Sequence, residues 1–253
     1  ICRLNMRRGT LLTLLLVFQF LFLNFSIAQI KNEISNEQLT VRNAASVYFK
    51  SLNEQSRIYR GVQYTGFPYK LSNGHQYFET QFPILGSVYY DGILYNNIPM
   101  WYDLVKNQVI VQYVDGFSEI KLHNELIDYF SIYDHHFVHL GRDKIGNNVL
   151  SEGFYDLVYV GKTQVLVKRS KGTLKEVNTG IALTILKQKN EVYLVKEGVY
   201  LPVNSQASVL NALGSKQREI QEFLRKSNVK FRKDPENAIV RMVRYHDLLT
   251  EVK

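Results

Sequence analysis

Three acid-glycine pairs, each lying between two runs of β-branched and aromatic residues, constrain the fold of this chain most strongly. The pairs are Asp91-Gly92, Asp115-Gly116 and Glu197-Gly198, and they separate residues 87–90 from 93–95, 109–114 from 117–122, and 192–196 from 199–203. Such pairs favour the positive φ angles of tight hairpin turns. Lys106-Asn107 and Gly161-Lys162 predict two further turns. Successive hairpins join antiparallel strands, so the sequence predicts an α+β protein dominated by an antiparallel meander that forms a barrel-like sheet or a sandwich.

Apolar residues have helical spacing on both sides of this β region, which predicts helices there. A short helix is expected within residues 36–53, followed by an irregular, aromatic-rich lead from 60 to 83. Near the C-terminus, residues 205–213 and 215–226 are helical candidates, and Asp234-Pro235-Glu236 offers an N-cap and a first-turn proline for a last helix up to residue 249. The predicted organisation has four parts. A signal peptide over 1–28 is followed by the short helix and irregular lead over 29–85. A β domain over 86–203 comes next, and a helical segment over 204–253 packs on the sheet.

The first 28 residues have the pattern of a cleavable secretory signal peptide. Arg3, Arg7 and Arg8 precede a largely apolar run from residue 11 to 25. The run ends in Ser26-Ile27-Ala28, which predicts cleavage between Ala28 and Gln29. A retained membrane anchor is the alternative, but the uninterrupted apolar stretch is shorter than the roughly 20 residues that cross a bilayer. We therefore expect an exported protein, periplasmic, outer-membrane-associated or extracellular, with no transmembrane segment after cleavage.

Cleavage would change both the cysteine content and the charge of the chain. The single cysteine, Cys2, lies before the predicted cut, so the mature chain would contain no disulfide and no thiol nucleophile. Loss of three arginines would lower the formal net charge from +8 to +5, with 28 basic and 23 acidic residues. This excess is modest and dispersed, which argues against nucleic acid as a partner.

Two motifs resemble ligand sites but have simpler explanations. On one strand His135 and His139 would share a face, with His136 opposite, but about 13 Å would separate them, which is too far for one metal ion. Gly161-Lys162-Thr163 imitates the end of a phosphate-binding loop, but Asp156 stands where that motif needs glycine. We therefore predict no metal site and no cofactor, and a hairpin turn at Gly161-Lys162.

Catalytic patterns are weak throughout, so we assign no catalytic residue. No G-x-S-x-G motif occurs. A hydrolase that uses a carboxylate pair, or His75, His123 or His139 as a base, remains an alternative. The carboxylates that such a pair could draw on are Asp91, Asp103, Asp115, Glu119, Asp128 and Asp156.

Aromatic residues are the one excess in the composition, with 17 tyrosines and 14 phenylalanines. Most are expected to pack in the core and across strands. Trp101 and Tyr102, which lie beside Pro99, are predicted to be the exposed pair that contacts a partner, because exposed aromatic rings stack on sugars or anchor proteins.

Five segments of the sequence carry a resemblance: NEQSRIY at 53–59, GSVYYDG at 86–92, WYDL at 101–104, GKT at 161–163 and the last helix. In these segments the chain resembles a family of exported, β-rich proteins of Bacteroidetes-type bacteria whose function is unknown. The resemblance implies a location in the cell envelope and no activity. The expectation is therefore a non-enzymatic secreted or envelope protein that binds a protein or glycan partner, with a hydrolase or a structural assembly component as alternatives.

Overall fold

The computed structural model describes residues 56–66, 71–141, 150–178 and 181–251. All of these belong to the second of two compact units, Glu54–Lys253. The predicted signal peptide and the predicted helix within 36–53 lie outside the described residues.

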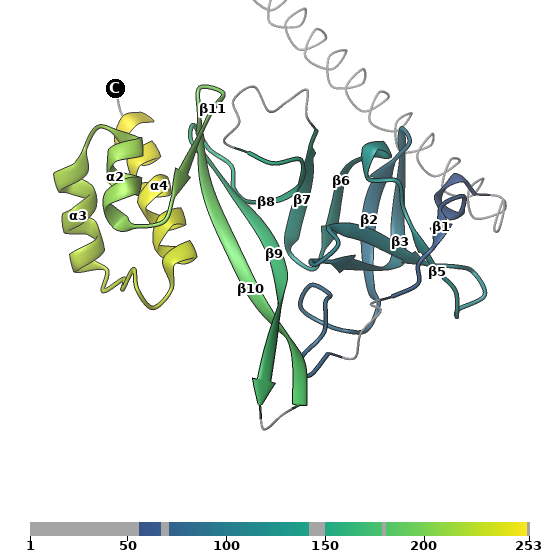
Figure 1. Ribbon diagram of the computed structural model, residues 1–253. Helices are drawn as coiled ribbons and strands as arrows, with labels where there is room; N and C mark the ends of the chain where they lie inside the picture. Colours follow the sequence, from purple (N-terminus) through teal and green to yellow (C-terminus); the bar gives the residue numbers. More distant parts are fainter. Residues whose placement is uncertain (1–55, 67–70, 142–149, 179–180, 252–253) are drawn as a thin grey trace, which may run out of the picture. The chain divides into compact units, whose positions relative to one another are not determined.

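Antiparallel strands dominate the described part of the chain, as the sequence predicts. They form one 11-stranded sheet in the order β1-β5-β4-β3-β2-β6-β7-β8-β9-β10-β11 (Figure 1). The bounds are β1 Val62–Gln63, β2 Ile84–Tyr90, β3 Ile93–Asp103, β4 Gln108–Gln112, β5 Glu119–Lys121, β6 Ile127–Ile132, β7 His135–Leu140, β8 Gly153–Tyr159, β9 Gln164–Asn178, β10 Ile181–Lys196 and β11 Val199–Val203. Two short 3-10 helices, Arg57–Tyr59 and Asn124–Leu126, precede β1 and β6.

Most predicted turns are confirmed. Asp91-Gly92 joins β2 to β3 and Glu197-Gly198 joins β10 to β11, each with positive φ at both residues. Asn107 has a φ of 51° in the turn between β3 and β4. At Asp115 the expectation of a two-residue turn is wrong, because Tyr113 N donates to Ser118 O and a longer loop results.

Two hairpins were not expected from the sequence. A turn at Tyr133 and Asp134 divides the segment from 130 to 140 into β6 and β7. The strand that follows the predicted turn at Gly161-Lys162 and the strand predicted at 192–196 are the ends of the long β9–β10 hairpin, paired continuously from Gln164 and Val195 to Asn178 and Ile181.

Two β-bulges coil the sheet around β2 and β3. Asn97, with a φ of 57°, is the extra residue opposite the Gly86-Ser87 step, and Asp128 is extra opposite Tyr89-Tyr90. Asn124 Nδ2 donates to Asn107 O, and only two residues later Leu126 O accepts from Asp91 N. Asn107 and Asp91 lie in the turns at opposite ends of β3, which in a straight strand would be about 30 Å apart. The bulges bend the strands and bring those ends together.

The coiled sheet nevertheless does not close. β1 and β11 remain its edges, so the barrel-like sheet that the sequence allowed beside a sandwich does not become a closed barrel. The meander is also interrupted: β6 pairs with β2 instead of β5, which divides the strands into one meander from β2 to β5 and another from β6 to β11.

Three helices follow the sheet: α2 Gln206–Leu213, α3 Gln217–Lys226 and α4 Pro235–Glu251. Ser205 caps α2 by accepting from Ser208 N, and Asp234 Oδ1 accepts from Asn237 N at the start of α4. The helices pack on one side of β9–β11, where Val165, Leu194 and Val203 share a core with apolar residues of all three helices. On the other side of these strands, Leu166 and Tyr193 pack with Tyr155 in a separate cluster.

Candidate functional site

The sheet changes direction at β8, and Asp156 lies at the point of change. Residues 153–156 of β8 pair with β7, whereas residues 156–159 pair with β9. Asp156 is the one residue of β8 that pairs with both neighbouring strands: it lies opposite Phe137 of β7 and Val167 of β9. Where β7 and β9 diverge, polar side chains fill the space between them.

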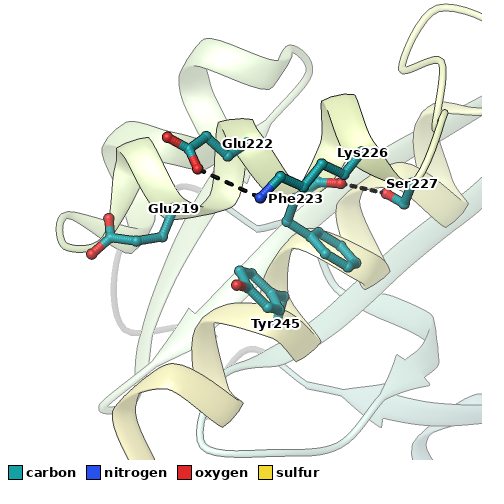
Figure 2. Close-up of a pocket in the computed structure, with 6 residues that line it drawn as sticks. All are labelled: Glu219, Glu222, Phe223, Lys226, Ser227 and Tyr245. Atoms are coloured by element: carbon teal, nitrogen blue, oxygen red, sulfur yellow. Dashed lines mark hydrogen bonds and ion pairs between the residues drawn. The ribbon is translucent and has the colours of Figure 1, made fainter.

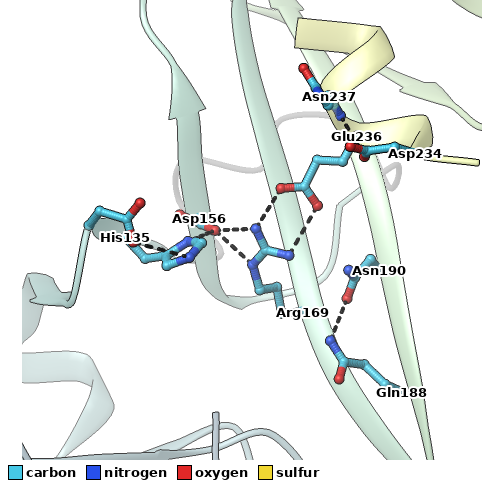
Figure 3. Close-up of polar contacts among 9 residues, drawn as sticks. His135, Asp156, Arg169, Gln188, Asn190, Asp234, Glu236 and Asn237 are labelled. Carbon is cyan, nitrogen blue, oxygen red and sulfur yellow. Dashed lines mark hydrogen bonds and ion pairs between the residues drawn. The ribbon is translucent and has the colours of Figure 1, made fainter. Parts of the chain in front are cut away.

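His135 and Arg169 both bind the buried Asp156 carboxylate. His135 Nδ1 lies 2.6 Å from Asp156 Oδ2, and Arg169 Nε donates to the same oxygen over 2.7 Å (Figure 3). The side chains of Asp156 and Arg169 are 1% and 6% exposed. A buried carboxylate needs such partners, because an unpaired charge in the interior costs several kcal/mol.

Arg169 also connects the sheet to α4. Its Nη1 and Nη2 atoms donate to the two carboxylate oxygens of Glu236 over 3.1 and 2.7 Å. Burial acts to lower the pKa of Arg169, but the hydrogen bond to Glu236 and the charge of Asp156 outweigh it and raise that pKa. The guanidinium therefore stays charged and is saturated by two carboxylates. The ring of Phe78 packs edge-on against His135, with centroids 5.0 Å apart.

An open pocket of about 540 Å³ lies over this cluster, and we call it the His135 pocket. It is lined by four carboxylates, one histidine, one amide and three apolar side chains: Asp134, Asp156, Asp234, Glu236, His135, Asn237, Leu157, Val158 and Val240. Arg169 is the cation bound among these carboxylates, and it is already paired. The pocket thus combines an apolar wall with an excess of negative charge, in a chain whose net charge is positive.

A second, smaller depression of about 370 Å³ lies between α3 and α4 (Figure 2), and we call it the Phe223 groove. Phe223 and Tyr245 stack within it, with ring centroids 4.2 Å apart and planes inclined by 10°. Ser227 Oγ donates to the carbonyl of Phe223. Since the two rings face each other, part of their surface is used in helix packing.

Trp101 and Tyr102 are buried, at 7% and 1% exposure, so the prediction that they form an exposed pair is wrong. They are neighbours on β3 and point to opposite faces of the sheet, and both faces are covered. Trp101 Nε1 donates to Gln81 O, and its ring packs with Tyr64 and Ile110. Tyr102 packs against phenylalanines of β6, β7 and β8. Because the sheet is coiled, β3 has strand neighbours and cover on every side.

The three histidines proposed as bases lie apart from the cluster. His75 O accepts from Lys171 Nζ, and burial, followed by the charge of Lys171, lowers the pKa of the His75 ring. His123 is exposed beside Glu125, and the His139 ring packs against Phe154. His135 was not among the predicted bases, since nothing local in the sequence connects it to Asp156.

Of the six candidate carboxylates, Asp156 alone lines a described pocket. Asp103 is fully buried, accepts from the turn amides of Val105 and Lys106, and accepts from Tyr64 Oη over 2.5 Å. Asp115 accepts from two amides of its own loop. The carboxylate brought nearest to Asp156 through Arg169 is Glu236, which no sequence motif indicated.

The predicted turn at Gly161-Lys162 is confirmed, and α4 holds it in place. Thr163 N donates to the buried Asp247 Oδ2 over 3.0 Å. A Cβ atom at Gly161 would lie 2.5 Å from that same oxygen, so glycine permits the close approach. The Gly161-Lys162-Thr163 sequence is therefore explained by the packing of α4 against this turn.

Comparison of the chain with protein-family models, with curated proteins and with solved structures found no match. Within the part of the chain that the structure describes, no helix is both long enough and apolar enough to cross a bilayer.

Proposed function

We propose that this chain is an exported, non-enzymatic protein of the cell envelope or exterior that binds a protein partner, and that the His135 pocket receives a lysine or arginine side chain of that partner. The observation that carries this proposal is the composition of the pocket. Its carboxylates outnumber the single internal cation, and they surround an apolar wall.

Both parts of a long basic side chain find a counterpart in this pocket. The aliphatic stem can lie against Leu157, Val158 and Val240. The charged end can pair with Asp134, whose side chain is 93% exposed and has one oxygen 3.6 Å from His135 Nε2, or with Asp234. Asp156, in contrast, is occupied by His135 and Arg169 and supports the pocket from below.

Titration with a capped Gly-Arg-Gly peptide, followed by NMR of the histidine rings and backbone amides, tests the proposal. We expect the signals of His135 and of the first turn of α4 to move. In the Asp134→Asn/Asp234→Asn variant, where asparagine keeps the helix cap, we expect binding about tenfold weaker. The control is Glu219→Gln/Glu222→Gln in the Phe223 groove, which should bind as the parent does.

Two results would argue against the pocket as the binding site. One is equal binding of a capped Gly-Gln-Gly peptide. The other is loss of binding in the control variant instead, which would place the arginine site at Glu219 and Glu222 of the Phe223 groove.

Export is tested independently by N-terminal sequencing of the protein recovered from producing cells. We expect the mature chain to begin at Gln29. A chain that retains the apolar run from residue 11 to 25 and fractionates with membranes would contradict cleavage.

A hydrolase is the second candidate, and the His135–Asp156 pair favours it. Because an ionised carboxylate only accepts, the 2.6 Å contact places a hydrogen on Nδ1 of His135, and Nε2, which lies 3.6 Å from Asp134 Oδ1, is the atom that would take a proton from a substrate. If turnover of an ester or glycoside is found, His135→Asn should abolish it. His136→Asn, on the opposite face of β7, should leave it unchanged.

A further inference from the structure

The distal half of the β9–β10 hairpin extends past the strands that flank its base (Figure 1). β8 covers the outer edge of β9 only at Val165–Val167, and β11 covers the outer edge of β10 only from Val192 onward. A two-stranded ribbon is marginally stable in water by itself. The rest of this ribbon therefore needs other support.

The chain supplies that support to β10 and to only one position of β9. On the outer edge of β10, Ser72 N donates to Thr184 O, and the Asn73 side chain bonds both backbone groups of Leu186. On the outer edge of β9, Lys171 N donates to Leu104 O. Backbone groups alternate in direction along a strand, so those of Thr173 and Lys175 also point outward. None of the described residues bonds them.

The two ends of the sheet are protected in ways that this part of β9 is not. β1 is only two residues long, and β11 carries Pro202, which has no N–H to donate. Gly172–Glu176 contains no proline and no bulge. It also exposes Leu174, at 46%.

The charge of the ribbon indicates what would pair with this edge. Residues 170–190 contain four lysines and one glutamate. Lys171 is bound to the carbonyls of His75 and Tyr77, and Lys189 pairs with Glu191, which leaves Lys175 and Lys187 at the surface. An added strand would lie directly beside Lys175 of β9 and one strand away from Lys187 of β10, so carboxylates on it would be favoured.

We propose that an extended, acidic segment of a partner protein adds to the sheet at Thr173 and Lys175 of β9. This is a second surface, separate from the His135 pocket, and it does not depend on the function proposed for that pocket. Strand addition uses main-chain hydrogen bonds for affinity and side-chain pairs for selectivity.

A capped heptapeptide of alternating glutamate and valine is the probe, titrated into isotope-labelled protein purified from its producing cells. We expect the Thr173 and Lys175 amide signals to shift and their hydrogen exchange to slow. The same peptide with lysine in place of each glutamate should bind about tenfold more weakly. Equal binding of the two peptides, shifts that miss β9, or no shift at millimolar peptide would overturn the proposal.

Two matched proline variants locate the edge. Thr173→Pro removes an outward N–H of β9, and Gln188→Pro removes one on the outer edge of β10; both leave the bonds between β9 and β10 intact. We expect Thr173→Pro to weaken binding about tenfold and Gln188→Pro to leave it unchanged. The reverse result would overturn the proposal. If Thr173→Pro unfolds the ribbon, the Lys175→Glu/Lys187→Glu variant decides instead. This variant should bind the lysine peptide more tightly than the glutamate peptide, and an unchanged preference for the glutamate peptide would overturn the proposal.

Discussion

Asp156 shows how one residue can hold together a sheet that changes direction. It is the last residue paired with β7 and the first paired with β9, and its carboxylate binds a side chain from each of those strands. Its neighbour Arg169 extends the contact to Glu236 of α4. Three strands and a helix therefore depend on two charged residues that are almost wholly buried.

Removal of Arg169 should be strongly destabilising. Arg169→Met leaves the buried Asp156 without its charged partner, and breaking a buried pair in this way costs about 3–5 kcal/mol. Urea unfolding monitored by circular dichroism measures the loss. Lys189→Met, which removes a pair exposed to solvent, is the control and should change the free energy of unfolding by less than about 1 kcal/mol. Similar losses in the two variants would contradict the role of the buried pair.

His246 should make the stability depend on pH. Burial lowers the pKa of its ring below the ordinary value of 6.5, although Asp247 opposes this. Below pH 6.5 the unfolded chain therefore binds a proton that the folded protein does not, so stability decreases as the pH falls through this region. We expect His246→Asn to flatten the dependence of the unfolding free energy between about pH 7 and 5. His123→Asn, at an exposed histidine, should keep the parent slope; the same slope in His246→Asn would contradict the assignment.

The site could not have been predicted residue by residue. Asp156 and Arg169 are 13 residues apart in the sequence and Glu236 lies 67 residues beyond Arg169, and no spacing rule connects the three. The exposure of Trp101 and Tyr102 depends on coiling of the sheet, which local propensity does not encode.

At the scale of single elements, Asn97 is the residue that lets β3 bend. Its φ of 57° is a left-handed conformation that asparagine tolerates and β-branched residues do not. We expect Asn97→Val to cost about 1–2 kcal/mol in urea unfolding and Asn97→Gly to cost little. The adjacent Asn96→Val, at an exposed position paired with Ser87, should be accepted. Equal costs for the two valine variants would show that the bulge carries no conformational constraint.

Elements with local chemical signals were the predictable ones. Asp91-Gly92, Glu197-Gly198 and the Asp234-Pro235 start of α4 were predicted because turn and cap residues act within a few positions. The turn at Tyr133 was missed because a tyrosine occupies its positive-φ position, with a φ of 56°. The length of the β9–β10 hairpin was missed because polar residues and lysines at 170–173 and 187–190 interrupt its apolar runs.

For the molecule as a whole, the helices and the last strands form one cooperative unit. Val165, Leu194 and Val203 are buried only because α2, α3 and α4 cover them. We expect a chain that ends after residue 204 to lose ordered β9–β11 structure and to expose apolar surface. Hydrogen exchange and dye binding measure this; native protection of β9 in the truncated chain would contradict it.

We propose that the His135 pocket contacts a protein partner in the envelope, and photo-cross-linking in producing cells is the decisive test. A photoreactive residue replaces Asn237 at the pocket rim, or Arg218 on the exposed surface of α3 as the control. We predict that one protein is captured from position 237 but not from position 218, and that this capture is lost in the Asp134→Asn/Asp234→Asn background. We also predict that the cross-link joins the probe to a residue of the partner beside a lysine or arginine. The same products from both positions, or capture that survives loss of the two carboxylates, would contradict the claim.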